Sequence, residues 1–156
     1  EIAGLLAIVE RDLANAKVPG LSEDWRFNIA YNAALQAATA ALAASGFRAV
    51  REQHHYRTVQ SLALTIGWPS SRVDRLDRFR KKRNITGYES AGVISDAEAR
   101  EMLGLAAELR SAVLAWLGKH HRRLVRLGRA RQTGIEDGHR AAQASSAGLG
   151  LVSLPR

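Results

Sequence analysis

The chain has 156 residues, of which 46% are hydrophobic, so it is long enough for one domain with a substantial core. It contains no cysteine, which excludes disulfides and thiolate zinc sites and is typical of a reducing cytoplasm. No apolar run approaches the roughly 20 residues of a membrane span, and the first residues lack the basic-then-apolar order of a signal peptide. We therefore expect a soluble cytoplasmic protein with no membrane segment.

The formal net charge of +8 is unevenly distributed. Residues 1–71 are neutral, whereas residues 119–156 hold eight Lys or Arg against two Asp or Glu. A second basic run, residues 72–83, has seven basic and two acidic residues. Such regions favour a polyanion partner such as nucleic acid. The alternative is a solvated helix face followed by a solubilising tail.

Helical patterns dominate the first half of the chain. Apolar residues recur at helical spacing over residues 5–13 and stop before the turn at residues 18–20. Ser22 is predicted to cap a second helix that lasts to about Ser45, before Gly46. This helix is rich in alanine, which allows close helix approach, so larger side chains must anchor it: Trp25, Phe27, Ile29, Tyr31, Leu35 and Leu42.

Three further helices are expected. One covers about residues 53–67; the next is capped by Ser70 or Ser71 and ends near Asn84; the last begins at the capping box of residues 95–98 and ends near Leu117. Their inward-facing residues are predicted to be Val59, Leu62, Ala63, Ile66, Val73, Leu76, Phe79, Met102, Leu105, Ala106, Leu109, Val113 and Trp116.

Short connections between these helices predict an all-α protein, an antiparallel bundle of four to five helices over residues 1–118. Residues 119–156 form a basic, Gly/Ala/Ser-rich C-terminal extension that we expect to be partly disordered or ordered by a partner. Within it, residues 119–127 either extend the last helix or form a basic amphipathic segment.

The run RKKRNITGY at residues 80–88 concentrates groups that bind phosphate. Arg83 offers a planar fork of donors, and Asn84 and Tyr88 add neutral hydrogen-bonding groups beside it. Phosphate or nucleic-acid binding is accordingly assigned to Arg80, Lys82, Arg83 and Asn84. No phosphate-binding glycine loop, dinucleotide fingerprint or Gly-x-Ser-x-Gly motif competes with this assignment.

The histidines do not predict a metal site. His54-His55 and His120-His121 are adjacent pairs, whereas two ligands on one helix face are three or four residues apart. Asp74 and Asp77 stand among arginines and are best explained as ion pairs. We expect neither a metal nor a cofactor.

An acidic, capped second helix containing Ala30-Tyr31-Asn32-Ala33-Ala34, a His-containing start to the third, and Arg-Lys-Lys-Arg-Asn-x-x-x-Tyr at the end of the fourth occur in this order. The arrangement resembles the HEPN superfamily over about residues 2–118. The resemblance implies a helical homodimer and, in many members, a metal-independent ribonuclease toxin paired with a nucleotidyltransferase-like antitoxin. It also implies that Arg83 stabilises the pentacovalent phosphate while a histidine, four to six residues further on, moves the proton.

The sequence departs from this pattern at Tyr88, because no histidine lies between Arg83 and His120. A phenol with a pKa of about 10 is a poorer base at neutral pH than an imidazole near 6.5. Tyr88 is thus a candidate to position phosphate or donate a proton, and the resemblance makes it a candidate for AMP transfer. His55 supplies the missing imidazole if the third helix packs near Arg83; the alternative is a structural histidine.

Tyr31 and Asn32 are open to two interpretations, as groove-facing polar residues or as interior residues with paired polar atoms. The resulting hypothesis is an HEPN-like RNA- or nucleotide-binding protein, either a toxin-like ribonuclease or a descendant with weakened catalysis. The alternative is a non-catalytic module for dimerisation or for docking on a nucleotidyltransferase-like partner. A third hypothesis is nucleic-acid binding by the basic extension alone.

Overall fold

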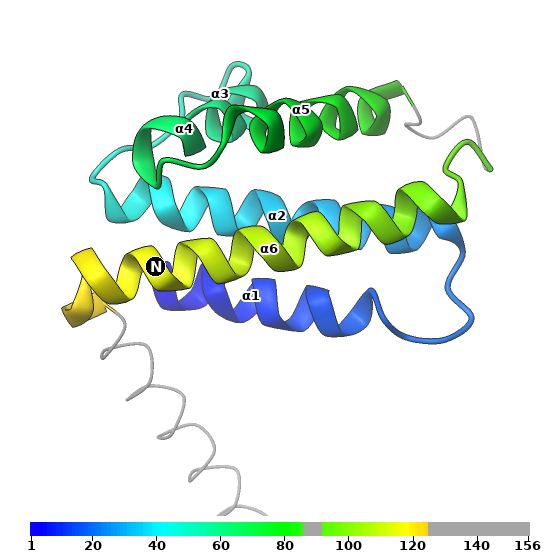
Figure 1. Ribbon diagram of the computed structural model, residues 1–156, viewed down its shortest axis with the longest axis horizontal. Coiled ribbons are helices and arrows are strands. Elements are labelled where there is room, and N and C mark those ends of the chain that lie inside the picture. The colour runs from blue at the N-terminus through cyan, green and yellow to red at the C-terminus, as the bar shows by residue number, and fades with distance from the viewer. Residues whose placement is uncertain (86–91, 125–156) are drawn as a thin grey trace, which may run out of the picture.

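The computed structural model describes residues 1–85 and 92–124, which contain helices and no strand (Figure 1). The all-α prediction is therefore confirmed for this part of the chain. Its helices are α1 (Ile2–Asn15), α2 (Glu23–Ala44), α3 (His54–Gln60), α4 (Leu62–Thr65), α5 (Ser70–Ile85) and α6 (Asp96–His120).

Helix ends follow the capping chemistry of the sequence. The Ser22 hydroxyl accepts the Trp25 N–H at the start of α2, and Ser95 and Glu98 form a reciprocal capping box at the start of α6. The predicted N-cap of α5, at Ser70 or Ser71, lies too far along the chain. The Pro69 carbonyl accepts the N–H of Val73, so Pro69 takes the N-cap position instead of Ser70 or Ser71.

The helix expected over residues 53–67 is divided at Ser61 into α3 and α4. The Ser61 hydroxyl donates to the Thr58 carbonyl at 2.7 Å, and the Thr65 hydroxyl donates to the Ser61 carbonyl at 3.0 Å. Such side-chain bonds offer the backbone an alternative to the helical ladder. The break leaves Leu62 buried but Ala63 exposed, so the expected inward position of Ala63 is wrong.

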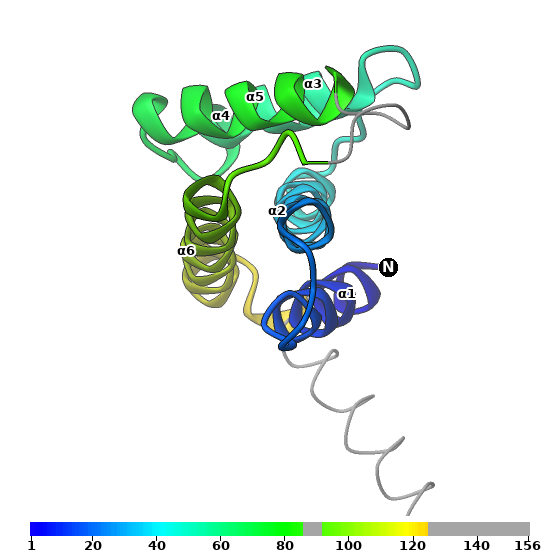
Figure 2. The ribbon, with the colours of Figure 1, turned by 90° about the vertical axis from the view of Figure 1, so that its right-hand side faces the viewer.

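Two layers make up the arrangement. Helices α1, α2 and α6 lie side by side, and α2 contacts both of the others extensively (Figure 1). α2 and α6 run in the same direction, and their starts are joined because Asp24 accepts the N–H groups of Gly92 and Ile94 while Arg26 pairs with Asp96. In Figure 2, where α2 and α6 are seen nearly end-on, α5 lies across both helices, with α3 and α4 in the same layer.

The core is built around α2, whose alanines allow close approach from several sides. Seven of them are fully buried: Ala30, Ala33, Ala34, Ala37, Ala38, Ala40 and Ala41. Phe27 and Tyr31 fill the space beside them, and Phe27 meets Phe79 of α5 edge to face at 5.3 Å between ring centroids. Trp25 is 65% exposed, so its expected role as an anchor is wrong; Phe27 takes the buried side of that turn.

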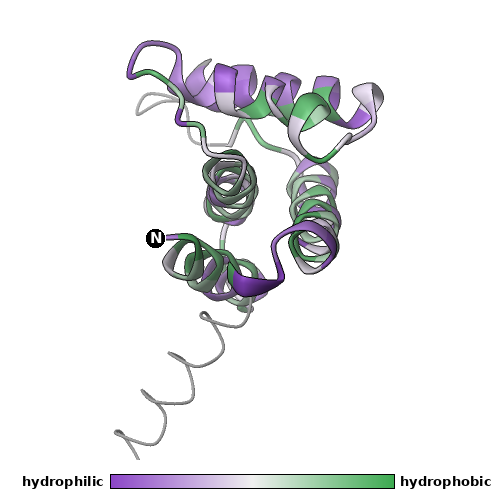
Figure 3. Ribbon diagram, turned by 90° about the vertical axis from the view of Figure 1, so that its left-hand side faces the viewer, coloured by the Kyte–Doolittle hydropathy of each residue, from purple (hydrophilic) through white to green (hydrophobic). Residues whose placement is uncertain are grey.

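Hydrophilic residues gather in the layer of α3 and α5 (Figure 3).

α6 continues to His120, so the residues just after the expected boundary at 118 extend the last helix. Residues 125–156, and with them most of the predicted basic extension, lie outside the described residues. No helix in the described part of the chain is long and apolar enough to cross a bilayer.

Candidate functional site

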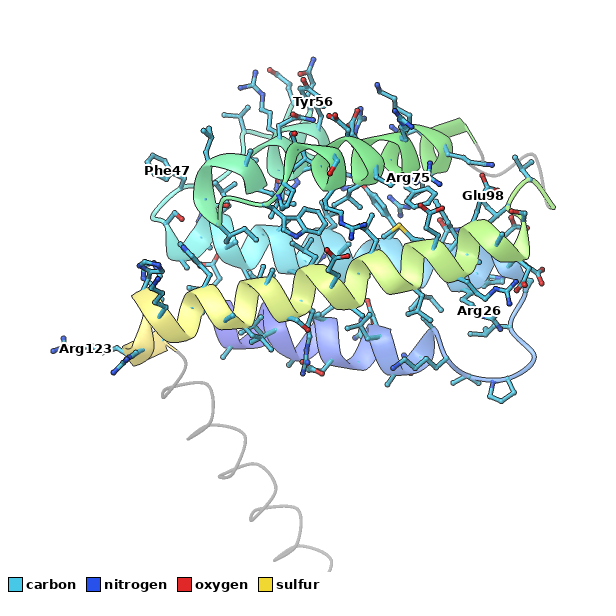
Figure 4. The ribbon with its side chains drawn as sticks, viewed as in Figure 1. Arg26, Phe47, Tyr56, Arg75, Glu98 and Arg123 are labelled. Atoms are coloured by element: carbon cyan, nitrogen blue, oxygen red, sulfur yellow. The ribbon has the colours of Figure 1, made fainter. Side chains whose placement is uncertain are left out.

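An open pocket of about 640 Å³ lies where the first turn of α3 meets the last turns of α5. Gln53, with a φ of 56° in the left-handed region, turns the chain into α3 and so directs the first residues of that helix towards α5. The pocket is lined by Arg51, Gln53, His54, His55, Tyr56, Arg80 and Asn84. Figure 4 shows Tyr56 on the outer side of this layer.

Arg80 is held in place within the pocket from two sides. Its Nε donates to the Asp77 Oδ1 at 2.7 Å, and its Cζ lies over the Tyr56 ring, 5.2 Å from the centroid. Burial opposes ionisation of Asp77, but hydrogen bonds from Arg80 and Lys81 outweigh it and hold the pKa of that carboxyl below its usual value. The Arg80 guanidinium is therefore both fixed and partly neutralised.

Arg83 and His55 lie on the same buried ring, that of Tyr31. The Arg83 Cζ is 5.0 Å from the Tyr31 centroid, and the Arg83 Nε donates to the Asn28 Oδ1 at 3.3 Å. The His55 and Tyr31 ring centroids are 6.2 Å apart. Arg83 does not line the pocket itself, but it contacts the same Tyr31 ring as His55, which does line the pocket. The packing of α3 against α5 that the His55 hypothesis required is thus present.

The charge of Arg83 acts on both of its neighbours. Burial lowers the pKa of His55 below 6.5, and the charges of Arg83, His54 and Arg80 lower it further. Burial raises the pKa of Tyr31 to about 12, an effect that Arg83 and Arg80 oppose. At neutral pH the site therefore contains a neutral imidazole beside a guanidinium.

Tyr31 and Asn32 point to different parts of the interior. Tyr31 is 1% exposed, and its hydroxyl has no hydrogen-bond partner among residues 1–85 and 92–124. The Asn32 Nδ2 donates to the Asp12 Oδ2 at 2.6 Å, which ties α2 to α1. Of the two earlier interpretations, the interior one describes both residues, although only Asn32 has its polar atoms paired.

The remaining predicted site residues do not all lie at the pocket. Asn84 is exposed at the pocket, whereas the ammonium group of Lys82 pairs with Glu98 and so faces α6. Hydrogen bonds from Lys82 and from Ser95 lower the pKa of Glu98 to about 2. Tyr88 lies outside the described residues.

Acidic residues of α6 neutralise much of the basic run at residues 72–83. Arg72 pairs with Glu108 and Arg75 with Glu101, as Lys82 does with Glu98. These pairs join α5 to α6 and leave the surface less cationic than the sequence count indicates. Among the described residues, Arg78 of this run has no ion pair, and neither does Arg51, which lines the pocket.

Four pocket residues were not predicted: Arg51, Gln53, His54 and Tyr56. The signal in the sequence was the run QHHY at residues 53–56, where three rings follow one another at a predicted helix start. At the other histidine pair, the His121 ring packs against Trp116 at a tilt, with centroids 4.7 Å apart, which is a packing role. Among the described residues, no group of three or more His, Cys, Asp or Glu is arranged to hold a metal ion.

Comparison with known proteins identifies no relative. No protein-family model, no curated protein and no solved structure matches the chain.

Proposed function

We propose that this chain is an HEPN-like RNA-binding protein that cleaves RNA without a metal ion at the pocket between α3 and α5. The observation that carries the proposal is that His55 and Arg83 contact one buried ring, Tyr31, beside an open pocket lined by Arg80. Helices α1, α2, α5 and α6 alternate in direction along the chain, which supports an HEPN-type bundle, and we propose that the basic residues after α6 extend it.

Metal-free RNA cleavage needs a base for the ribose 2′-hydroxyl and a cation for the charge that develops on phosphorus. Because its pKa is lowered, His55 is neutral at pH 7 and suited to accept that proton. The 2′-oxygen then forms a bond to phosphorus while the bond from phosphorus to the 5′-oxygen breaks. The 2′-proton passes to the imidazole and the 5′-oxygen takes a proton from solvent water, leaving a 2′,3′-cyclic phosphate and a 5′-hydroxyl.

The arginines divide the binding of phosphate. Arg80 lines the pocket and supplies hydrogen-bond donors to the phosphate. Arg83, which lies over the Tyr31 ring, lowers the pKa of His55 and adds positive charge near the reacting phosphorus. An imidazole from α3 then takes the place of the motif histidine that Tyr88 replaces. The family resemblance further leads us to propose a homodimer and a nucleotidyltransferase-like antitoxin, with Tyr88 as the site of AMP transfer.

The test is to incubate the pure protein with end-labelled RNA in the presence of EDTA. We expect products with 2′,3′-cyclic phosphate ends, and a loss of at least about 100-fold in rate for His55→Ala and Arg83→Ala. His120→Ala is the matched control, because it removes a histidine far from the pocket, and circular dichroism checks that each variant folds. If the wild type cuts no RNA and its expression is harmless to cells, the ribonuclease proposal fails.

One observation favours the alternative of a non-catalytic docking or dimerisation module. The basic residues of α5 that face α6 are already paired within the chain, which weakens the attraction of that surface for a polyanion. Such a module predicts a stable complex with a nucleotidyltransferase-like protein, seen by size-exclusion chromatography, and no RNA cleavage. His55→Ala would leave that complex intact.

A further inference from the structure

Tyr56 is an aromatic residue that the fold leaves accessible in the pocket. Its side chain lines the cavity, and the residue is 41% exposed, whereas Tyr31 beneath the same pocket is 1% exposed. An exposed ring lined up with polar and cationic groups forms a surface on which another flat, partly polar ring can stack. Tyr56 is not part of the buried core cluster, so its ring is available to a ligand in the pocket.

Arg80 makes this ring more rigid. Its guanidinium lies over one face of the Tyr56 ring and is held there by Asp77, a carboxylate that is only 7% exposed. A phenol ring backed by a fixed guanidinium is a prebuilt stacking platform, so little side-chain entropy is lost when a ligand binds. Bases of nucleic acids stack well on such aromatic and guanidinium planes.

The rest of the pocket supplies hydrogen-bonding groups for the edge of a base and a cation for its phosphate. The amides of Gln53 and Asn84 offer donors and acceptors to the edge of a base, and Arg51 on the rim has no ion pair within the described residues. The volume of about 640 Å³ is within the range of small-ligand sites, about 300–1,000 Å³.

We propose that Tyr56 and Arg80 form a stacking subsite for one unpaired nucleobase of an RNA strand, with the adjoining phosphate bound at Arg51. This inference rests on the proposed RNA function and adds which part of the RNA the pocket selects. A base inside a duplex is already stacked on both faces, so the subsite takes single-stranded RNA and excludes paired RNA.

Binding is measured by fluorescence anisotropy with a labelled pentanucleotide whose riboses are 2′-O-methylated, since the blocked 2′-oxygen cannot attack phosphorus. We expect Tyr56→Leu to weaken binding about tenfold, as stacking contributions to single-strand binding imply, and Tyr56→Phe to stay close to the wild type. Phe47→Leu is the matched control: Phe47 is 67% exposed but does not line the pocket (Figure 4). Arg51→Gln is expected to weaken binding and to reduce its salt dependence by about one phosphate contact.

Two small ligands isolate the contribution of the base to binding. 5′-AMP and ribose 5-phosphate share sugar and phosphate, so a stacking subsite binds 5′-AMP more tightly in calorimetry, and Tyr56→Leu removes the difference. The subsite proposal is overturned if the two ligands bind equally, or if the Tyr56→Leu variant binds the pentanucleotide as tightly as the wild type does. In either case the proposed function still stands if the wild type cleaves RNA. Binding of 5′-AMP without binding of the pentanucleotide overturns the assignment to an RNA strand. If the wild type neither binds nor cuts RNA, both proposals fall.

Discussion

The guanidinium of Arg83 lies over the ring of Tyr31, with the Arg83 Cζ 5.0 Å from the ring centroid. Since Tyr31 is buried, this contact holds a positive charge next to the pocket and keeps it beside His55, which contacts the same ring. Cation–π contacts of this type contribute about 0.5–2 kcal/mol, more when they are desolvated. Tyr31 thus links the two residues that the proposed chemistry uses, without needing its hydroxyl.

Tyr31→Phe is expected to keep the fold and to raise the free energy of unfolding by up to about 1 kcal/mol, because it removes a buried hydroxyl that has no partner among the described residues. Tyr31→Ala removes the ring as well and is expected to cost about 3–5 kcal/mol. Urea unfolding followed by circular dichroism measures both. A loss of more than about 1 kcal/mol in Tyr31→Phe would show that the hydroxyl makes a stabilising bond.

The helices could be predicted because their signals are local. Ser22, Ser95 and Glu98 cap their own helices, and Gly46, with a φ of 86°, ends α2 as a left-handed residue after Ser45. The division at Ser61 was missed, because its hydroxyl can bond to a carbonyl in an intact helix as well as in a broken one. Which residues of a helical turn are buried also depends on helices that are distant in the sequence. For this reason Trp25 was wrongly predicted to be a buried anchor.

The candidate site could be predicted only in part. Arg80, Asn84 and His55 were identified from their chemistry, and they do meet in one pocket. Tyr56 was not identified, because nothing local indicates that the first turn of α3 faces the last turns of α5. The pairing of α5 bases with α6 acids was likewise hidden, since it depends on how the two helices are aligned.

His55 is expected to titrate below 6.5 in NMR spectra of its imidazole protons, because burial and the neighbouring charges disfavour its protonated form. Arg83→Gln removes one of these charges, so it should move the pKa of His55 back up towards 6.5, though not fully, since burial is the larger cause. No movement in Arg83→Gln would mean that the two side chains are not coupled. The rate of RNA cleavage should show the same shift in its acidic limb.

The same shift makes stability depend on pH. The unfolded chain protonates His55 at about pH 6.5, whereas the folded chain does so only at lower pH, so the unfolded state gains protons first. The free energy of unfolding should therefore fall as pH drops through 6.5. His55→Gln should flatten this part of the curve, and His120→Gln, which changes a histidine outside the pocket, serves as the comparison.

Glu98 is expected to contribute to acid unfolding at lower pH. Its pKa falls from 4.5 to about 2, mainly through the hydrogen bond from Lys82, so the folded state favours the ionised carboxylate. This contribution is present above pH 4.5 and is lost as pH falls towards 2, because the unfolded chain takes up the proton first. Thermal unfolding of Glu98→Gln should lose less stability between pH 6 and pH 3 than the wild type. Glu108→Gln, which breaks the Arg72 ion pair on the same pair of helices, is the control; an equal effect of both variants would contradict the special role of Glu98.

The alanines of α2 set how closely α1 and α6 approach it, and this closeness can be tested by adding volume. Ala38 is fully buried in the core cluster, so Ala38→Leu forces side chains or backbone to move, which typically costs about 1–3 kcal/mol and sometimes more. Ala14→Leu adds the same atoms to an exposed position of α1 and is expected to change stability by no more than about 0.5 kcal/mol. Because α2 also carries Tyr31, a displaced α2 should move the rings of Tyr31 and His55 apart, and RNA cleavage should fall together with stability in Ala38→Leu. Full activity in a destabilised Ala38→Leu would instead show that the pocket tolerates movement of the helix beneath it.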